Sequence, residues 1–142
     1  MMGAAQAVAT AAVFVWLGMV LAISFLEAPL KFRAPEVTQR IGLGIGRLVF
    51  RALNVAETVL AVVLVVAAVV ALPSVGVLTA GAVVVGTLAV QLVAVRPALS
   101  RRSDRVLAGE DVPRSRNHYV YIALEAVKVV ALIVTGVLLL TG

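Results

Sequence analysis

Residues 119–140, YVYIALEAVKVVALIVTGVLLL, are long enough to cross a bilayer as one helix, yet they contain two charged residues, Glu125 and Lys128. A spanning helix needs about 20 predominantly apolar residues, and each ionisable group placed in hydrocarbon costs roughly 2.5 to 3.5 kcal/mol. Because Glu125 and Lys128 are three positions apart, they lie on one helical face, where they can neutralise each other and turn towards a partner helix. The stretch therefore predicts a membrane helical bundle with charged groups inside it.

The composition of the whole chain is that of a membrane protein. Of its 142 residues, 63% are hydrophobic and 13% are charged, and the mean hydropathy is +1.14, whereas soluble globular chains have roughly 25% charged residues. Too little chain lies outside the apolar stretches for a second folded domain, so residues 1–142 are predicted to form a single transmembrane domain. The absence of cysteine excludes disulfides and thiolate chemistry.

Four apolar stretches predict an all-α integral membrane protein with four transmembrane helices in an antiparallel bundle. They cover residues 4–26, 52–72, 75–95 and 119–140. We expect the first helix to end at Pro29 and the third at Pro97, because proline disfavours helix for the residue before it. The link at Pro73 is short, so the second and third helices are expected to be antiparallel neighbours. The alternative for the first stretch, a cleaved signal peptide, would have a basic leading region and an apolar core of about 7 to 15 residues, and the sequence shows neither.

Two polar and basic connections, residues 27–51 and 96–118, join these helices. In the first, Ile41, Ile45 and Leu48 recur at helical spacing beside arginines, which predicts a short amphipathic segment lying in the membrane interface. In the second, residues 99–107 are predicted to form one or two amphipathic turns before a glycine and a proline break them. The alternating glycines at 42, 44 and 46 do not indicate a nucleotide site, because a phosphate-binding loop needs a strand and a different spacing.

The positions of the basic residues predict the orientation. Eleven of the twelve lysines and arginines lie in the two connections, so these connections are expected to face the cytoplasm of a cell-membrane protein and both termini to face outside. The expected partners are the lipid bilayer and anionic lipid headgroups at the basic connections; a homo-oligomer or a membrane-protein partner is left open, and nucleic acid is not expected. The eleven residues are Lys31, Arg33, Arg40, Arg47, Arg51, Arg96, Arg101, Arg102, Arg105, Arg114 and Arg116.

A weak internal repeat relates the second and fourth stretches. Residues 52–59, ALNVAETV, align without gaps with residues 123–130, ALEAVKVV, which lie 71 positions later. Gly18 also precedes Pro29 by eleven residues, as Gly86 precedes Pro97. The pattern predicts two helix hairpins of parallel topology, related by a pseudo-two-fold axis along the membrane normal. Chance matching of valine and alanine in an apolar chain is the alternative.

Polar residues within the apolar stretches form the candidate site. Intramembrane charges are usually functional, so we predict a substrate or ion site near the bundle centre and open to the cytoplasm, with an ion pair that only fixes helix register as the structural alternative. Its members are Glu57, Glu125, Lys128, Asn54 and Gln91. His118 is predicted to be an interfacial anchor, with a proton relay as the alternative. Trp16 is expected to serve packing.

No cofactor and no metal are expected. His118 is the only histidine and there is no cysteine, so one chain cannot supply two imidazoles or any thiolate to a haem or a zinc ion.

Several short motifs resemble those of a known family. They are Trp16-Leu17-Gly18, Ser24-Phe25, Ala28-Pro29-Leu30-Lys31-Phe32, Gly46-Arg47, Val49-Phe50 and Asn117-His118. Together they resemble the prokaryotic relatives of transmembrane protein 205, the family that has the domain of unknown function 4149. The resemblance covers nearly the whole chain and implies a small four-helix membrane protein. It implies no activity, because Glu125 and Lys128 stand where the family's last helix is expected to be mostly apolar with an asparagine.

Three classes of function follow. The first is a small transporter, exporter or channel in which Glu57, Glu125 and Lys128 bind a cation or exchange protons. The second is a non-catalytic accessory or scaffold subunit of a larger membrane complex, in which the same charges are structural. An enzyme that processes lipids or quinones is the weakest of the three, because the sequence shows no metal-ligand pair and no nucleophile with a base at helical spacing.

Overall fold

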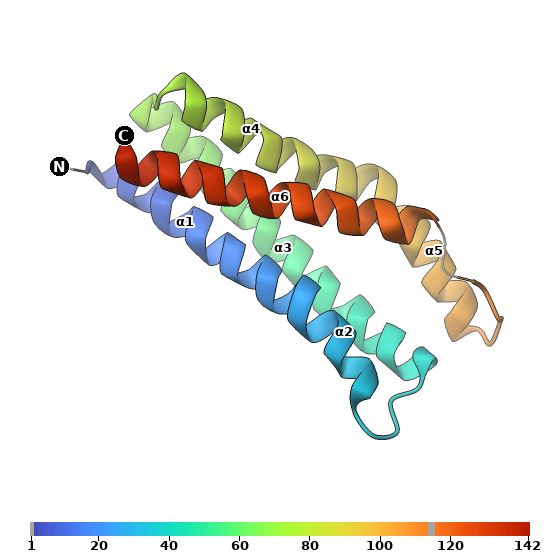
Figure 1. Cartoon of the computed structure of the whole chain (residues 1–142). Coiled ribbons are helices and arrows are strands. Elements are labelled where there is room, and N and C mark those ends of the chain that lie inside the picture. The colour runs from blue at the N-terminus through green and yellow to red at the C-terminus, as the bar shows by residue number, and fades with distance from the viewer. Residues whose placement is uncertain (1, 114–115) are drawn as a thin grey trace.

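The computed structural model describes residues 2–113 and 116–142, and helix is the only regular structure in this part of the chain. Four helical runs are long and apolar enough to cross a membrane: Ala4–Arg33, Gln39–Ala71, Val75–Leu107 and Arg116–Thr141. The predicted all-α four-helix architecture is confirmed. Figure 1 shows the N- and C-terminal ends of the chain at the same end of the bundle. Of the predicted basic residues, Arg114 lies outside the described residues.

The helices are longer than the predicted spans. The second and third runs have 33 residues each, which is about 50 Å of helix, whereas the hydrocarbon core of a bilayer is about 30 Å thick. Their excess length contains the arginines of residues 39–51 and 96–107. This end of the bundle, opposite the termini, is called the basic end below.

The first and third runs pass through proline, so the prediction that they end at Pro29 and Pro97 is wrong. Each proline lies in the first turn of a new α-helical segment, α2 (Ala28–Leu30) or α5 (Arg96–Leu107), where its missing N–H is tolerated. A π-helical segment precedes each of them: η1 (Leu21–Glu27) follows α1 (Ala4–Val20), and η3 (Gln91–Val95) follows α4 (Val75–Val90).

The π-helical hydrogen bonds are visible where these segments end. The N–H of Ala28 donates to the carbonyl of Ile23, and the N–H of Arg96 donates to the carbonyl of Gln91. Both bonds span five residues instead of the four of an α-helix. After α2, a short 3₁₀ turn, η2 (Lys31–Arg33), ends the first run.

The amphipathic segment around Ile41 and Ile45 is the first part of α3 (Gln39–Ala71), not a separate piece in the interface. Thr38 caps this helix, since its hydroxyl accepts a hydrogen bond from the N–H of Ile41 at 3.2 Å. No proline interrupts residues 39–71 and apolar residues continue at helical spacing, so nothing ends the helix at the predicted border. Residues 99–107 likewise form helix, but as part of the continuous third run.

The turn between α3 and α4 is short, as expected, but the two helices make few contacts with each other. Leu72 ends α3 in the left-handed conformation, and the hydroxyl of Ser74 accepts a hydrogen bond from the N–H of Val77 to begin α4. Beyond the turn α3 packs mainly on α1, and α4 packs mainly on α6 (Arg116–Thr141). The expected antiparallel neighbours are in contact, and the second and third runs also meet where α3 contacts α5, but side-chain packing makes this pairing looser than those of α3 with α1 and of α4 with α6.

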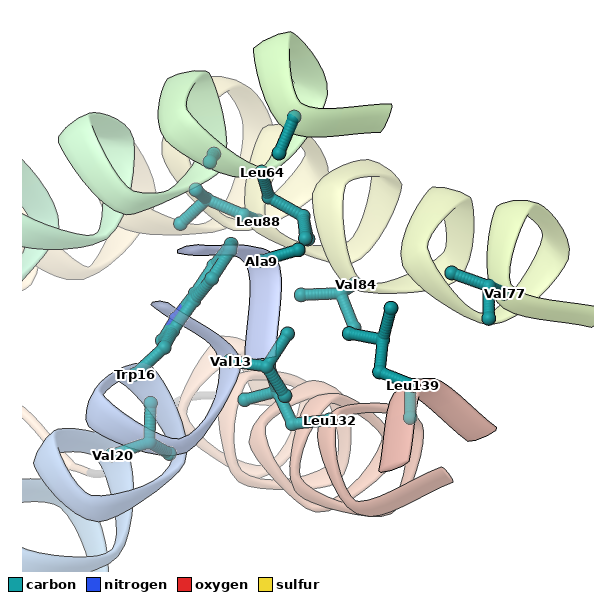
Figure 2. Packing of buried hydrophobic residues seen from close by; sticks show 13 residues of the cluster. Ala9, Val13, Trp16, Val20, Leu64, Val77, Val84, Leu88, Leu132 and Leu139 are labelled. Atoms are coloured by element: carbon teal, nitrogen blue, oxygen red, sulfur yellow. The ribbon is translucent and has the colours of Figure 1, made fainter. Parts of the chain in front are cut away.

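The hydrophobic core lies in the half of the bundle that is nearer the termini. Figure 2 shows buried side chains of all four runs meeting there. At its centre Val13, Trp16, Val84 and Leu132 have no exposed surface. At about 25 cal/mol per Å² of apolar surface, such burial stabilises a soluble core, but between membrane helices it acts mainly through close packing.

The two halves of the chain have matching features. Ala9, Trp16 and Val20 of α1 are buried, and so are the residues 68 positions later, Val77, Val84 and Leu88. Both π-helical segments also end two residues before a proline. The match is incomplete, because α1 packs closely along α6 whereas α3 and α4, the equivalent pair, make few contacts. These features agree with the predicted repeat and show where the two halves have diverged.

Candidate functional site

The ammonium group of Lys128 is the centre of a buried polar network. Its Nζ lies 2.5 Å from Oε2 of Glu57, 2.6 Å from Oε1 of Glu125 and 2.8 Å from Oε1 of Gln91. Two of these three contacts, with Glu57 and Gln91, are hydrogen bonds, and the contact with Glu125 is an ion pair. The three acceptors come from α3, α6 and η3, which the helix packing brings together around one cation.

Trp16 and Ser24 complete this network from the first helical run. The indole Nε1 of Trp16 donates to Oε2 of Glu57 at 2.7 Å, and the hydroxyl of Ser24 donates to Oε2 of Glu125 at 2.5 Å. Gln91 Nε2 donates to Oε1 of Glu125 at 2.7 Å. All four helical runs therefore contribute to what is called the Lys128 network below: Trp16, Ser24, Glu57, Gln91, Glu125 and Lys128.

The sequence predicted four of these six residues. Trp16 does pack in the core, as expected, but it also donates a hydrogen bond to Glu57, and Ser24 was not singled out at all. A tryptophan in the middle of a span has one N–H that needs an acceptor when it is buried, which is a signal that could have linked Trp16 to a carboxylate. For Ser24 no such signal exists, because its contact with Glu125 depends on the rotation of η1.

The charged and amide side chains of the Lys128 network are buried. Glu57 and Lys128 have no exposed surface, and Gln91 and Glu125 are 1% exposed. Two carboxylates and one ammonium leave an excess of one negative charge when all are ionised, which is costly away from water. The network becomes neutral when it holds one additional proton. Oε1 of Glu57 is buried and has no hydrogen-bond partner among the residues that the structure describes.

A cavity of about 900 Å³ leads from the basic end to this network. Residues of η1, α2, η2, α3, η3, α5 and α6 line it, and α3 and α5 are in contact at this end. Ser24 and Glu125 line the cavity, whereas Glu57, Gln91 and Lys128 do not. Glu125 is therefore the ionisable member of the network that lines the cavity.

Two predicted site residues lie in the cavity wall and not in the network. Asn54 is half-buried and lines the cavity, although it is only one helical turn from Glu57. His118 lines it near the start of α6, where its ring meets the ring of Tyr119 edge to face at 5.6 Å between centroids. Residues three apart differ by about 60° around a helix, and here this offset leaves Glu57 buried against Lys128 and Asn54 at the cavity. The repeat alone does not predict which of the two faces Lys128.

The cavity wall is strongly basic. Lys31, Arg47, Arg51, Arg96 and Arg102 line it, and the single carboxylate in its wall is Glu125. Some of these cations have partners: Arg47 pairs with Asp104, and Arg102 donates to the carbonyls of Pro113 and Val112.

The other end of the bundle is closed towards the network. The core around Val13, Val84 and Leu132 lies between the network and the termini, and the small cavity of about 250 Å³ beside the Pro73 turn has its own, different lining. Of these two cavities, the one at the basic end reaches the network.

In residues 2–113 and 116–142 no group of three or more histidine, aspartate or glutamate side chains is placed to hold a metal ion. No protein-family model, no curated protein and no solved structure matches the chain.

Proposed function

We propose that this protein is a small proton-coupled membrane transporter, with the Lys128 network as its coupling site and the basic cavity as its substrate entrance. The observation that supports this most is the position of Glu125. It pairs with Lys128 inside the network and also lines the cavity. A core lies at the opposite end, and this supports a transporter open to one side over a continuous channel.

The charge balance of the network supports proton coupling. With one proton shared by Glu57 and Glu125, the buried charges sum to zero, and without it Lys128 is shared by two carboxylates. Loss or gain of that proton through the cavity changes which carboxylate holds the ammonium. Since the carboxylates belong to α3 and α6, such a change alters the attraction between two helices, which is what a coupling site must do.

The orientation belongs to the same proposal. With the basic end in the cytoplasm and both termini outside, the positive-inside rule is satisfied and the cavity opens inwards. The protein then lies in the cell membrane, with its arginines near anionic headgroups. The resemblance to the prokaryotic relatives of transmembrane protein 205 stays a prediction.

A pH jump on reconstituted protein tests the coupling site without knowledge of the substrate. Proteoliposomes adsorbed on a solid-supported membrane should give a transient charge displacement after the jump, and Glu125→Gln should abolish it. Glu110→Gln is the matched control, because Glu110 is an exposed carboxylate that pairs with Arg105 on the surface. Equal displacement by wild type and Glu125→Gln would contradict proton binding at Glu125.

A scaffold subunit of a larger membrane complex is the second candidate, and one observation favours it. Glu57 and Lys128 are fully buried, and Lys128 donates to Glu57 and Gln91 and pairs with Glu125, as in a structural cluster. Replacing a buried ionic cluster by apolar residues of similar volume is often neutral or stabilising. A variant with Glu57, Glu125 and Lys128 all replaced by leucine or methionine separates the two: a scaffold keeps its cellular function in this variant, and a transporter folds but loses it.

A further inference from the structure

Arg96 has an environment that the Lys128 network does not explain. Its guanidinium lies against two aromatic rings, with Cζ 4.9 Å from the centroid of Phe50 and 4.6 Å from that of Tyr121. These two rings meet edge to face at 5.9 Å. Aromatic faces hold a guanidinium in place without using its N–H groups, so Arg96 is positioned but not neutralised by them.

The hydrogen-bond donors of this group are not all used. Nε and Nη2 of Arg96 are shielded from solvent and have no hydrogen-bond partner among the described residues, and the same holds for the hydroxyl of Tyr121. A guanidinium has five N–H donors in a fixed planar arrangement, and leaving buried donors unpaired is unfavourable. Arg96 and Tyr121 both line the basic cavity, so an anion in the cavity reaches these donors once the Arg96 side chain shifts towards it.

A second cation, Lys31, lies against the Phe50 ring that Arg96 also contacts. Nζ of Lys31 lies 5.8 Å from the centroid of Phe50 and 5.6 Å from that of Phe32. Its side chain is only 10% exposed, and its ion pair with Glu27 is long, at 3.7 Å. Lys31 and Arg96 thus bring two positive charges to one aromatic cluster inside a cavity. An anion with two acceptor oxygens, a carboxylate or a phosphate, is the group that suits this arrangement.

The rest of the cavity indicates what the anionic group is attached to. A free anion would fill a small part of about 900 Å³. The remaining wall includes Phe25, Val55, Val59 and Ile122, and Val55 and Val59 are 62% and 57% exposed on a helix that crosses the membrane. The cavity therefore extends from the cations to the apolar outer surface of the bundle. An apolar chain attached to the anion would lie along this wall.

We propose that the basic cavity binds an anionic amphiphile, with its carboxylate or phosphate on Arg96 and Lys31 and its apolar chain along the wall of α3 and α6. As a statement about a substrate this rests on the proposed transport function, whereas the binding site itself does not. The amphiphile can come from the bilayer, as a lipid with a small acidic headgroup, or from the aqueous phase. Both sources share the same chemistry at Arg96.

Binding is tested with purified protein in a neutral detergent, titrated by calorimetry with hexyl phosphate, inorganic phosphate and hexanol. Hexyl phosphate should bind more tightly than either of the others, because only this compound has both the charge and the chain. Arg96→Gln should weaken its binding by about tenfold or more, and Arg96→Lys should restore it only in part, because lysine keeps the charge but loses the planar pair of donors. Arg101→Gln, the same change at an exposed position of α5 outside the cavity wall, is the matched control.

Two results would overturn the proposal. Equal weakening by Arg96→Gln and Arg101→Gln would reduce the effect to general surface charge, and equal binding of inorganic and hexyl phosphate would remove the apolar part of the site. If Arg96→Gln does not fold, Lys31→Gln provides the second variant and should weaken hexyl phosphate severalfold; binding unchanged in Lys31→Gln also contradicts the site. Failure here leaves the pH-jump result at Glu125 intact, so the two proposals fail separately.

A further experiment identifies whether the amphiphile comes from the bilayer or from the aqueous phase. Protein is incorporated in nanodiscs of phosphatidylcholine with a tenth of phosphatidic acid, and retained lipid is identified by native mass spectrometry. Retention of phosphatidic acid by wild type and its loss in Arg96→Gln support the site with a bilayer source. Hexyl phosphate binding without retained phosphatidic acid supports the site with a soluble source.

Discussion

Glu57 and Lys128, which the predicted repeat aligns at 71 residues apart, lie with Oε2 and Nζ at 2.5 Å. Two positions related by a two-fold axis can meet only if both lie close to that axis. Identical acids or identical bases at such positions would repel each other in a place without water. Glu57 and Lys128 have opposite charges, so they form an ion pair at a place where like charges would repel.

We expect the loss of Lys128 to be far more damaging than the loss of Glu57. Lys128→Met leaves two carboxylates buried without a cation, a change that costs about 3 to 5 kcal/mol when a buried pair is broken. Glu57→Gln leaves the balanced pair Glu125 and Lys128, and its carbonyl oxygen can still accept from Trp16 and Lys128, so about 1 kcal/mol or less is expected. Thermal unfolding in detergent measures both, and similar melting temperatures of the two variants would contradict the charge balance described for the network.

Trp16→Phe should destabilise the protein through Glu57. The variant keeps an aromatic ring in the core but removes the N–H that donates to Oε2 of Glu57 at 2.7 Å. A hydrogen bond to a charged group contributes about 1.5 to 3 kcal/mol. In a double-mutant cycle the penalty should shrink when Glu57 is already glutamine, because part of it comes from that charge. If the destabilisations by Trp16→Phe and Glu57→Gln simply add, Trp16 contributes to stability through packing alone.

The glycines of the spanning helices should respond differently to alanine. A Cβ on Gly136 would lie 2.7 Å from Cζ of Phe14, whereas a Cβ on Gly86 would have no atom within 4 Å. Within a helix alanine is favoured over glycine by about 0.5 to 1 kcal/mol, so Gly86→Ala is expected to be neutral or stabilising. Gly136→Ala must move the Phe14 ring between α1 and α6, and it should melt at a lower temperature than Gly86→Ala. A lower melting temperature for Gly86→Ala than for Gly136→Ala would contradict a close contact between Gly136 and Phe14.

The orientation can be tested with single cysteines, since the chain has none of its own. Ser74 and Ala108 are exposed at opposite ends of the bundle. In intact cells an impermeant thiol reagent should label Ser74→Cys, and it should label Ala108→Cys only after the membrane is opened. Labelling of Ala108→Cys alone in intact cells would place the basic end outside.

The sequence was a good guide to the spans because about 20 consecutive apolar residues have few other uses. It was a poor guide to the helix ends at Pro29 and Pro97. The rule disfavours helical geometry for the residue before proline, but Ala28 and Arg96 both adopt it, directly after the π-helical segments. In the same way a basic, amphipathic stretch beginning near Gln39 looked like a connection, although its helical spacing continues without a break into α3.

The charged residues of the candidate site were predictable from the sequence, but the directions of the side chains were not. Glu57, Glu125 and Lys128 stand out because ionisable groups are rare in spans, and the structure brings them together. Asn54 is on α3 like Glu57, but it faces the cavity. Arg96, which also lines the cavity, looked from the sequence like one of many basic residues outside the membrane. Which face a side chain takes depends on helix rotation, and whether one residue is taken up in a π-helical turn changes that rotation without leaving a mark in the composition.

The π-helical segments affect how this chain tolerates changes in length. A π-helical turn contains one residue more than an α-helical turn, so a deletion of one residue within Leu21–Glu27 can be absorbed by a return to ordinary α-helix. The helix on both sides of the deletion would then keep its alignment, whereas a deletion inside α1 would turn one side by about 100° relative to the other. In the first case Trp16 stays beside Glu57 and Lys31 stays beside Phe50, and in the second case these two contacts cannot both form. A shortened η1 should therefore yield a folded membrane protein whose network and cavity still share a common alignment.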